Sequence, residues 1–85
     1  MNEQLSNFKV TDRNSFAVFI SLLREEIIKN PDRYENNNLD DFLEAMTAYT
    51  KDLQGYYDNT KQNINADHPD WKTFADILMG SAVYE

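Results

Sequence analysis

Apolar residues recur at helical spacing in three stretches of the chain. In the first stretch they fall at positions i, i+3, i+4, i+7 and i+11, as Phe16, Phe19, Ile20, Leu23 and Ile27. This spacing places them on one face of an α-helix. Thr11 or Asp12 is expected to cap its start, because either side chain can accept a bond from a free backbone N–H. The helix is expected to end at Asn30, since Pro31 disfavours helical backbone in the residue before it.

The second stretch has the same period, with Leu39, Phe42, Leu43, Met46, Tyr49 and Leu53 on one face. Asn38 is the expected N-cap, and Asp41 stands three places later, where a capping-box acid belongs. Asp40, Asp41 and Glu44 fill the first turns, where negative charge meets the positive end of the helix dipole. Gly55 is the expected C-cap.

The third stretch carries Trp71, Phe74, Ala75, Leu78 and Ala82 on one face. Pro69 suits the first helical position, with Asp67 or His68 as the cap. The helix should run to within a residue or two of Glu85. Gly80 lies inside it, and because glycine weakens a helix, we expect it to allow the close approach of another backbone.

The segments between these stretches are expected to be loops at residues 31–37 and 56–67, the second anchored by Ile64. Residues 1–10 fit either a short helical turn or an extended arm. The chain is therefore predicted to be a single all-α domain, residues 1–85, with three main helices and a possible short N-terminal fourth element. Val18, Leu22 and Ile28 lie off the first stripe and could pair two copies in a homo-oligomer.

The charge balance narrows the classes of partner. The chain of 85 residues has a formal net charge of −7, and its acidic residues are spread along the sequence. A scattered acidic surface repels phosphate backbones, so we expect no direct binding to nucleic acid. The same surface can dock on a basic protein.

The expected location is the cytoplasm. Cysteine is absent, which excludes disulfides and thiolate metal sites. The first residues lack the basic end and apolar run of a secretory signal, so none is expected. No stretch approaches the length of about 18 apolar residues that a membrane span requires.

The asparagines and carboxylates of residues 36–41 resemble a metal site at first sight. A calcium loop needs alternating oxygen ligands, a glycine at its sixth place and an acid at its twelfth. The registers that begin at Asp32, Asn36 and Asp58 place Leu43, Thr47 and Pro69 at the twelfth position, so all three fail. Helix capping is the favoured interpretation, and no metal is expected.

The remaining polar residues do not indicate an enzyme. Asp41 and Glu44, or Asp40 and Glu44, share a helix face, but solvated carboxylates of ordinary acidity are poor general acids. His68 is the sole histidine and lacks an evident nucleophile or set of metal ligands. Gly55 is too isolated to form a phosphate-binding loop. We therefore expect no catalytic residues and no cofactor.

The aromatic residues are divided between core and surface. Trp71, Phe74, Phe42 and Phe16 are expected in the core, whereas the tyrosines flanking helix ends are expected to form its rim: Tyr34, Tyr56, Tyr57 and Tyr84. Tyrosine is also a favoured anchor at protein interfaces. The candidate partner-binding residues are the two adjacent tyrosines and two nearby acidic residues: Tyr56, Tyr57, Asp52 and Asp58. A rim around the core is the alternative role for the two tyrosines.

The sequence also resembles a known family. Tyr34-Glu35-Asn36, the run from Leu39 to Ala45, the Trp-x-x-Phe-Ala-x-x-Leu of residues 71–78 and Tyr84-Glu85 are similar to a family of short bacterial proteins classed as a domain of unknown function. That family has tryptophan where Tyr34 and Tyr49 stand here. The resemblance implies no known activity, cofactor or site residue.

A looser likeness concerns layout alone. Colicin-nuclease immunity proteins are acidic, helical and of similar size, and Asp52-Leu53-Gln54-Gly55-Tyr56-Tyr57 is similar to a segment of theirs with an inserted glycine. The leading hypothesis is a non-enzymatic protein-interaction module. The alternatives are an immunity-type inhibitor of a basic toxin and a small-ligand-binding domain.

Overall fold

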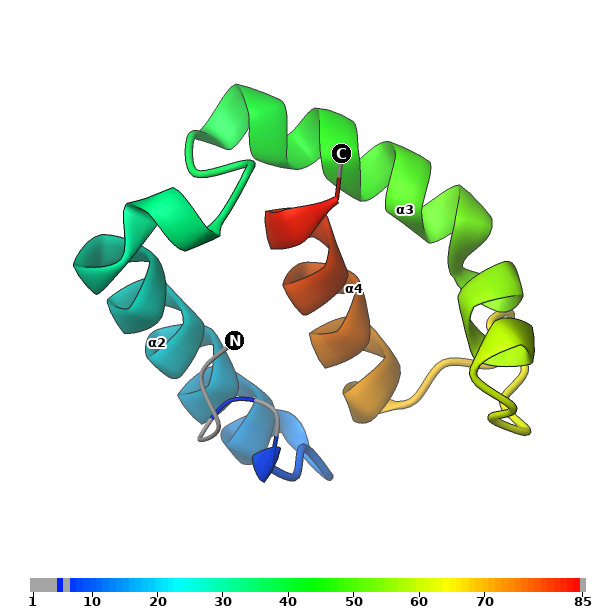
Figure 1. Cartoon of the computed structure of the whole chain (residues 1–85). Coiled ribbons are helices and arrows are strands. Elements are labelled where there is room, and N and C mark those ends of the chain that lie inside the picture. The colour runs from blue at the N-terminus through cyan, green and yellow to red at the C-terminus, as the bar shows by residue number, and fades with distance from the viewer. Residues whose placement is uncertain (1–4, 6, 85) are drawn as a thin grey trace.

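The computed structural model describes Leu5 and residues 7–84, and these form an all-α domain. Its elements are α2 (Arg13–Lys29), a short 3-10 helix η1 (Pro31–Arg33), α3 (Leu39–Asn59) and α4 (Trp71–Val83). The helix α4 lies between the other two and packs against both (Figure 1). The prediction of three main helices is thus confirmed. The expectation for residues 1–10 falls partly outside the described residues, although Leu5 and Asn7 are helical and residues 8–10 are irregular.

The start of α2 is fixed by a reciprocal cap. The Ser15 backbone N–H donates to Asp12 Oδ1 at 2.8 Å, and the Asp12 N–H donates to Ser15 Oγ at 3.0 Å. The backbone bond from Ser15 holds the pKa of Asp12 below its ordinary value. Of the two expected caps, the structure therefore selects Asp12, and the helix ends before Asn30 as predicted.

A buried carboxylate joins the end of α2 to η1. Glu26 is 5% exposed and accepts hydrogen bonds from Asn30 Nδ2 at 3.2 Å and Arg33 Nη1 at 3.4 Å. Tyr34 follows η1 and lies in the core, at 4% exposure, rather than on the rim. The burial of a charged residue requires such partners, so this corner of the fold depends on contacts that helical periodicity does not reveal.

The predicted end of α3 at Gly55 is wrong, because the helix continues to Asn59. Leu53 and Tyr57 both lie on its buried side, and this packing extends the helix through the glycine. The chain leaves the helix at Thr60, and Lys61 has a φ of 58°. The first four residues of the predicted 56–67 loop are therefore helical.

The connection between α3 and α4 is held by one apolar contact with the core and by one side chain of α3. Ile64 packs against the core as expected. Gln54 of α3 donates to the Ile64 carbonyl at 2.9 Å and accepts from the Ala66 N–H at 2.8 Å. One amide side chain thus replaces the backbone partners that the loop lacks.

The cap of α4 is Asp70, so the expectation of Asp67 or His68 with Pro69 in the first turn is wrong. The Thr73 backbone N–H donates to Asp70 Oδ1 at 3.0 Å, and this bond lowers the pKa of Asp70. The helix begins at Trp71, two residues later than expected, because the Asp70–Thr73 pair forms a full capping box.

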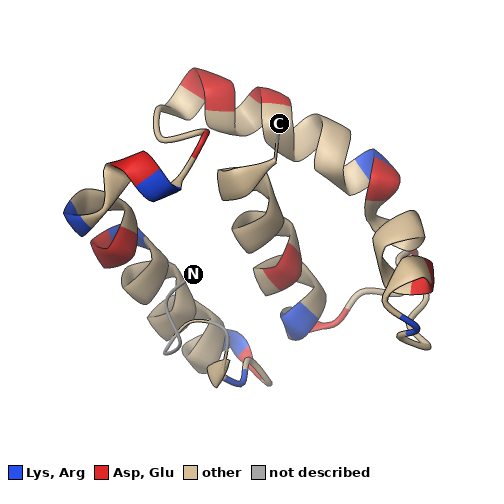
Figure 2. Cartoon of the chain, viewed as in Figure 1, with Lys and Arg blue, Asp and Glu red and all other residues tan. Residues whose placement is uncertain are grey.

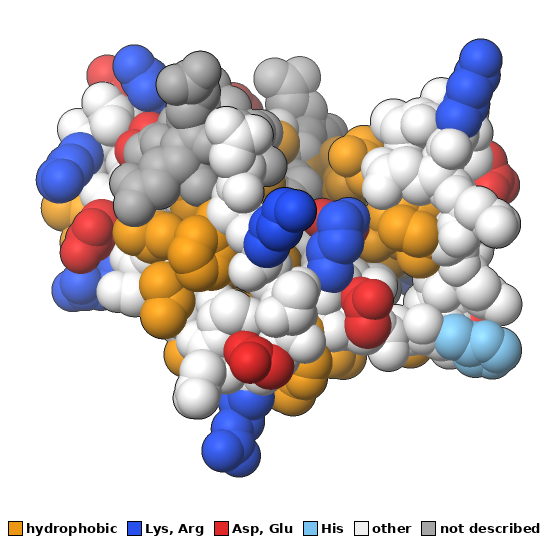
Figure 3. Space-filling view, turned by 90° about the horizontal axis from the view of Figure 1, so that it is seen from below, with side chains coloured by type: hydrophobic (Ala, Val, Ile, Leu, Met, Phe, Trp, Pro, Cys, Tyr) orange, Lys and Arg blue, Asp and Glu red, His pale blue; other side chains and the backbone are white. Residues whose placement is uncertain are grey.

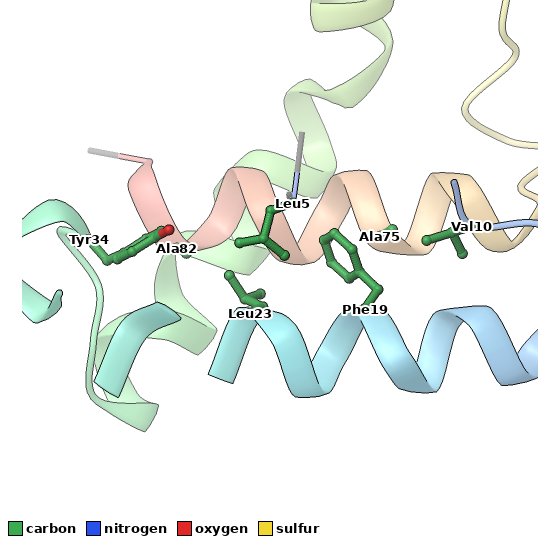
Figure 4. Packing of buried hydrophobic residues seen from close by; sticks show 7 residues of the cluster. All are labelled: Leu5, Val10, Phe19, Leu23, Tyr34, Ala75 and Ala82. Carbon is green, nitrogen blue, oxygen red and sulfur yellow. The ribbon is translucent and has the colours of Figure 1, made fainter. Parts of the chain in front are cut away.

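The core consists of two clusters. The larger lies between α2, α4 and the N-terminal segment (Figure 4) and contains Leu5, Val10, Phe19, Leu23, Tyr34, Ala75 and Ala82. The smaller joins α3 to α4 through Leu53, Tyr57 and Ile77. Both clusters contain residues of the predicted apolar stripes. The spacing of apolar residues therefore predicted the helices correctly.

Two expected core residues lie at the surface instead. Trp71 is 36% exposed and Phe74 is 40% exposed, and both contact the half-buried Phe16, at ring-centroid distances of 5.6 and 6.2 Å. Trp71 and Phe74 stand in the first turn of α4. The end of a three-helix bundle has no further layer to cover such side chains. The stripe residues Leu39, Leu43 and Ile20 are likewise exposed.

Each asparagine of the 36–38 run has a separate structural task. The Asn36 side chain donates to the carbonyls of Ser81 and Tyr84, and its backbone N–H donates to that of Ala82 at 3.1 Å. It thereby satisfies carbonyls at the end of α4 that have no partner within the helix. Asn37 donates to the Pro31 carbonyl at 3.3 Å.

Asn38 caps α3, as predicted. Its Oδ1 accepts from the Asp41 backbone N–H at 2.9 Å, and its Nδ2 donates to Asp41 Oδ2 at 2.7 Å. The run from Asn36 to Asp41 thus caps the start of α3 and binds free carbonyls at the end of α4.

Gly80 accommodates a side chain rather than a backbone. A Cβ at this position would overlap the ring of Tyr49, at its Cζ, Cε1 and Cε2 atoms, whereas a Cβ at Gly55 would meet nothing within 4 Å. The close approach predicted for Gly80 therefore exists, but its partner is the aromatic ring of α3.

The two glycines should respond in opposite directions to alanine. Gly80→Ala should lower the free energy of unfolding by about 1–3 kcal/mol, because the new methyl displaces the Tyr49 ring. Gly55→Ala should raise it by about 0.5–1 kcal/mol, because alanine loses less entropy in a helix. Urea denaturation of both variants measures these values. Equal effects of one sign would contradict the packing of Tyr49 on α4.

Loss of the Asn36 amide should loosen the end of α4. We expect Asn36→Ala to cost about 1–3 kcal/mol of stability, the usual effect of leaving half-buried carbonyls unpaired. Asn37→Ala is the matched control, since its single bond is exposed, and it should cost less than about 0.5 kcal/mol. Thermal unfolding compares the two. A similar small loss for both would show that Asn36 does not hold α4.

Candidate functional site

The neighbouring tyrosines of α3 have different environments. Tyr57 is fully buried, and its hydroxyl donates to Asp76 Oδ2 at 2.7 Å. Lys72 Nζ reaches the same oxygen at 2.9 Å and lies 6.0 Å from the centre of the Tyr57 ring. Tyr57 therefore joins α3 to α4, and its ring has no surface to offer a partner.

Tyr56 points outward, with 41% of its surface exposed, and its ring contacts those of Tyr57 and Tyr49 at 5.6 and 6.1 Å. Asp52 lies close by through Tyr84, whose hydroxyl donates to Asp52 Oδ2 at 2.6 Å and whose ring meets Tyr49 at 5.5 Å. Asp58 instead accepts from Gln54, the residue that holds the loop. Of the predicted set, the structure thus brings Tyr56 and Asp52 into one cluster.

Three tyrosines of this cluster, Tyr49, Tyr56 and Tyr84, line a hollow between α3 and α4, which we call the tyrosine cleft. It has a volume of about 480 Å³ and is lined by Tyr49, Tyr56, Asp76, Met79, Gly80, Val83 and Tyr84. Gly80 is essential to its shape, because the ring of Tyr49 rests where a side chain would otherwise stand. The lining is apolar apart from the hydroxyls and one carboxylate.

The hydroxyls of Tyr49, Tyr84 and the adjacent Tyr57 remain protonated at neutral pH. Burial, with the neighbouring Tyr56 and the charge of Asp76, raises the pKa of Tyr49 to about 12. The bond to Asp52 raises the pKa of Tyr84. Burial, followed by the bond to Asp76, raises that of Tyr57. Neutral phenols are hydrogen-bond donors and poor nucleophiles, so the arrangement is suited to binding.

Two hydroxyls in the cleft are free to bind. Within the described part of the chain, the hydroxyls of Tyr49 and Tyr56 make no hydrogen bond. By contrast, Oδ2 of Asp76 is already occupied by Tyr57 and Lys72. A ligand in the cleft would therefore meet apolar rings and two available O–H groups.

Tyr84 also forms part of a second, smaller hollow, which we call the acidic hollow. It has a volume of about 280 Å³ and is lined by Glu35, Asn36, Asp41, Glu44, Ala45, Ala48 and Tyr84. Residues 34–50 contain four acidic residues and no lysine or arginine. Figure 2 shows this concentration of Asp and Glu at the start of α3. The two hollows are neighbours, because Tyr84 belongs to both.

A third hollow adjoins the tyrosine cleft on its other side. It has a volume of about 660 Å³ and shares Tyr56, Asp76 and Met79 with the cleft. Its other walls include Val10 and Phe19 of the larger core cluster. The tyrosine cleft is therefore the middle of three successive hollows.

Exposed apolar side chains are also present outside the clefts. Hydrophobic groups reach the surface between Lys, Arg, Asp and Glu side chains on the side seen in Figure 3. The large exposed apolar residues that do not line the tyrosine cleft include Val18, Ile28, Leu39, Leu43 and Trp71. Val18 and Ile28 lie on α2 as the predicted pairing surface requires, while Leu22 is half-buried.

The remaining polar candidates are dispersed. No group of three His, Cys, Asp or Glu residues among those described could hold a metal ion. His68 is exposed in the loop, where its backbone N–H donates to the Asn65 carbonyl at 3.0 Å. None of the described helices is both long and apolar enough to cross a membrane.

Several residues of the cleft escaped the sequence analysis. The helical period places Tyr49 on the core stripe, and no binding role is predicted for Asp76, Met79, Gly80 and Val83. The last four follow the spacing i, i+3, i+4 and i+7, so they form a second face of α4. That pattern could have indicated a further contact surface on the helix.

Comparison with known proteins identifies a family and no function. No curated protein and no solved structure matches the chain. A family model, described as a family of unknown function (DUF7660), matches residues 12–85. This range includes all three main helices and every residue of the tyrosine cleft and the acidic hollow. The chain therefore belongs to this family of unknown function, DUF7660.

Proposed function

We propose that this domain is a non-enzymatic protein-interaction module and that the tyrosine cleft is its docking surface. The observation that carries the proposal is the exposed, aromatic lining of the cleft, with free hydroxyls on Tyr49 and Tyr56. Tyrosine supplies a large contact area at a low cost in entropy and is enriched among the residues that dominate binding energy. The rigid packing of the rings favours a surface that is formed before binding.

The composition of the lining favours a protein over a small ligand. A volume of about 480 Å³ is within the range of small-molecule sites, about 300–1,000 Å³. Such sites fix a ligand with several convergent polar groups. Here Tyr57 and Lys72 both bind Oδ2 of Asp76, so the polar groups that remain are the two phenol hydroxyls and Asp76 Oδ1. An apolar side chain of a protein needs no further polar contacts.

A second candidate is an immunity-type inhibitor of a basic toxin. The observation that favours it is the acidic hollow beside the tyrosine cleft, in a segment that has no basic residue. Such an inhibitor should protect cells that express a toxin encoded by a neighbouring gene. Protection that survives loss of the carboxylates Glu35 and Glu44 would exclude this role for the hollow.

Binding should depend on the exposed face of the cleft and not on exposed apolar residues elsewhere. Tyr56→Ser and Val83→Ser should each weaken binding of the natural partner about tenfold or more, because contacts with partly exposed interface residues are lost. Ile28→Ser is the control, since Ile28 is 62% exposed on α2. The partner is first captured from the source organism, purified and titrated by calorimetry against each variant.

The same variants separate binding from folding. All three should melt within a few degrees of the unsubstituted protein, because surface substitutions usually change stability by less than about 0.5 kcal/mol. Equal affinity of the partner for all three variants would contradict the proposed docking surface. A metabolite that raises the melting temperature only when Tyr56 is present would favour the small-ligand alternative.

A further inference from the structure

We infer that the tyrosine cleft and the acidic hollow form one docking groove, and that its occupant is a segment of a partner protein with an arginine or lysine beside an apolar side chain. The apolar side chain would enter the tyrosine cleft, and the cation would enter the acidic hollow on the other side of Tyr84. This inference rests on the proposed function and adds the chemistry of the partner.

Tyr84 is a fixed partition between the two hollows. Its hydroxyl is bonded to Asp52, its ring packs edge-on against Tyr49, and its backbone carbonyl accepts from Asn36. Because two residues of α3 and one residue of the loop before it hold Tyr84, both hollows are formed in the free protein. Binding therefore requires little ordering of the groove.

The acidic side of the groove lacks a counter-charge. Among the described residues, no lysine or arginine forms an ion pair with Glu35, Asp41 or Glu44. Within the same described residues, Asn38 is the only side chain that donates a hydrogen bond to any of the three, at Asp41. Three like charges around one hollow attract a cation, which would also relieve their mutual repulsion.

The floor of the acidic hollow suits the stem of a long side chain. Ala45 is buried and Ala48 is half-buried, so small methyl groups lie below the carboxylates. Lysine and arginine bury their aliphatic stems on such surfaces while the charged end remains near acidic groups. The Tyr84 ring at the border can also contact a guanidinium group.

The groove disfavours the other occupants. A second copy of this chain has the same net charge of −7 and would bring further carboxylates to the hollow. At about 280 Å³, the acidic hollow lies below the usual size of a small-molecule site, about 300 Å³ or more. One basic side chain of a protein is the simplest group that matches its charge and size.

Blocked dipeptides can test this chemistry without the natural partner. The probe is acetyl-Leu-Arg-amide, and its control is acetyl-Leu-citrulline-amide, which has nearly the same shape and no charge. The arginine probe should shift the methyl NMR signals of Ala45, Ala48 and Val83 in the full chain. The citrulline probe should bind at least about fivefold more weakly than the arginine probe. Added salt should reduce this difference in affinity.

Charge variants locate the cation. The double variant Glu35→Gln, Glu44→Gln should reduce affinity for the arginine probe about fivefold. Glu25→Gln, Asp67→Asn removes the same total charge at exposed positions and should change it little. Absence of shifts at Ala45 and Ala48, equal binding of the two probes or equal loss in the two double variants would overturn the inference.

The natural partner distinguishes failure of this inference from failure of the proposed function. If Tyr56→Ser abolishes its binding while Glu35→Gln, Glu44→Gln leaves it unchanged, the docking module stands and the cationic anchor is wrong. If Tyr56→Ser has no effect on the partner, the docking surface itself is wrong, whatever the dipeptides show.

Discussion

The hydrogen bond from the Tyr57 hydroxyl to the Asp76 carboxylate is the contact on which the arrangement of α3 and α4 depends. It joins two buried or half-buried groups at 2.7 Å, and Lys72 completes the charge balance at 2.9 Å. A charged acceptor makes such a bond stronger than one between neutral groups. Leu53 and Ile77 pack in the same cluster as Tyr57, so apolar contacts and this hydrogen bond together hold α3 against α4.

The shape of the tyrosine cleft depends on this hydrogen bond between Tyr57 and Asp76. With α3 fixed against α4, the Tyr49 ring rests on Gly80 and the Tyr84 ring rests on Tyr49. Asn36 then anchors the end of α4 to the loop before α3, which places the acidic residues next to Tyr84. The surface proposed for binding is thus made by residues from three segments, each held by a separate hydrogen bond.

Local features of the fold were predictable from the sequence, and the site largely was not. The helices and the caps Asp12 and Asn38 follow from short-range patterns and side-chain bonds to nearby backbone. The end of α3 was misjudged because packing of Tyr57 outweighs the helix-ending preference of Gly55. Successive helical residues point about 100° apart, so Tyr56 and Tyr57 face different directions, and which of them is buried depends on α4.

The most direct test is a double-mutant cycle on Tyr57→Phe and Asp76→Ala, followed by urea unfolding. A coupling energy of about 1.5–3 kcal/mol is predicted, the usual contribution of a hydrogen bond to a charged group. Tyr56→Phe in the same background should change stability by less than about 0.5 kcal/mol. A coupling energy near zero, or an equal loss from Tyr56→Phe and Tyr57→Phe, would contradict the assignment of Tyr57 to structure and Tyr56 to the binding surface.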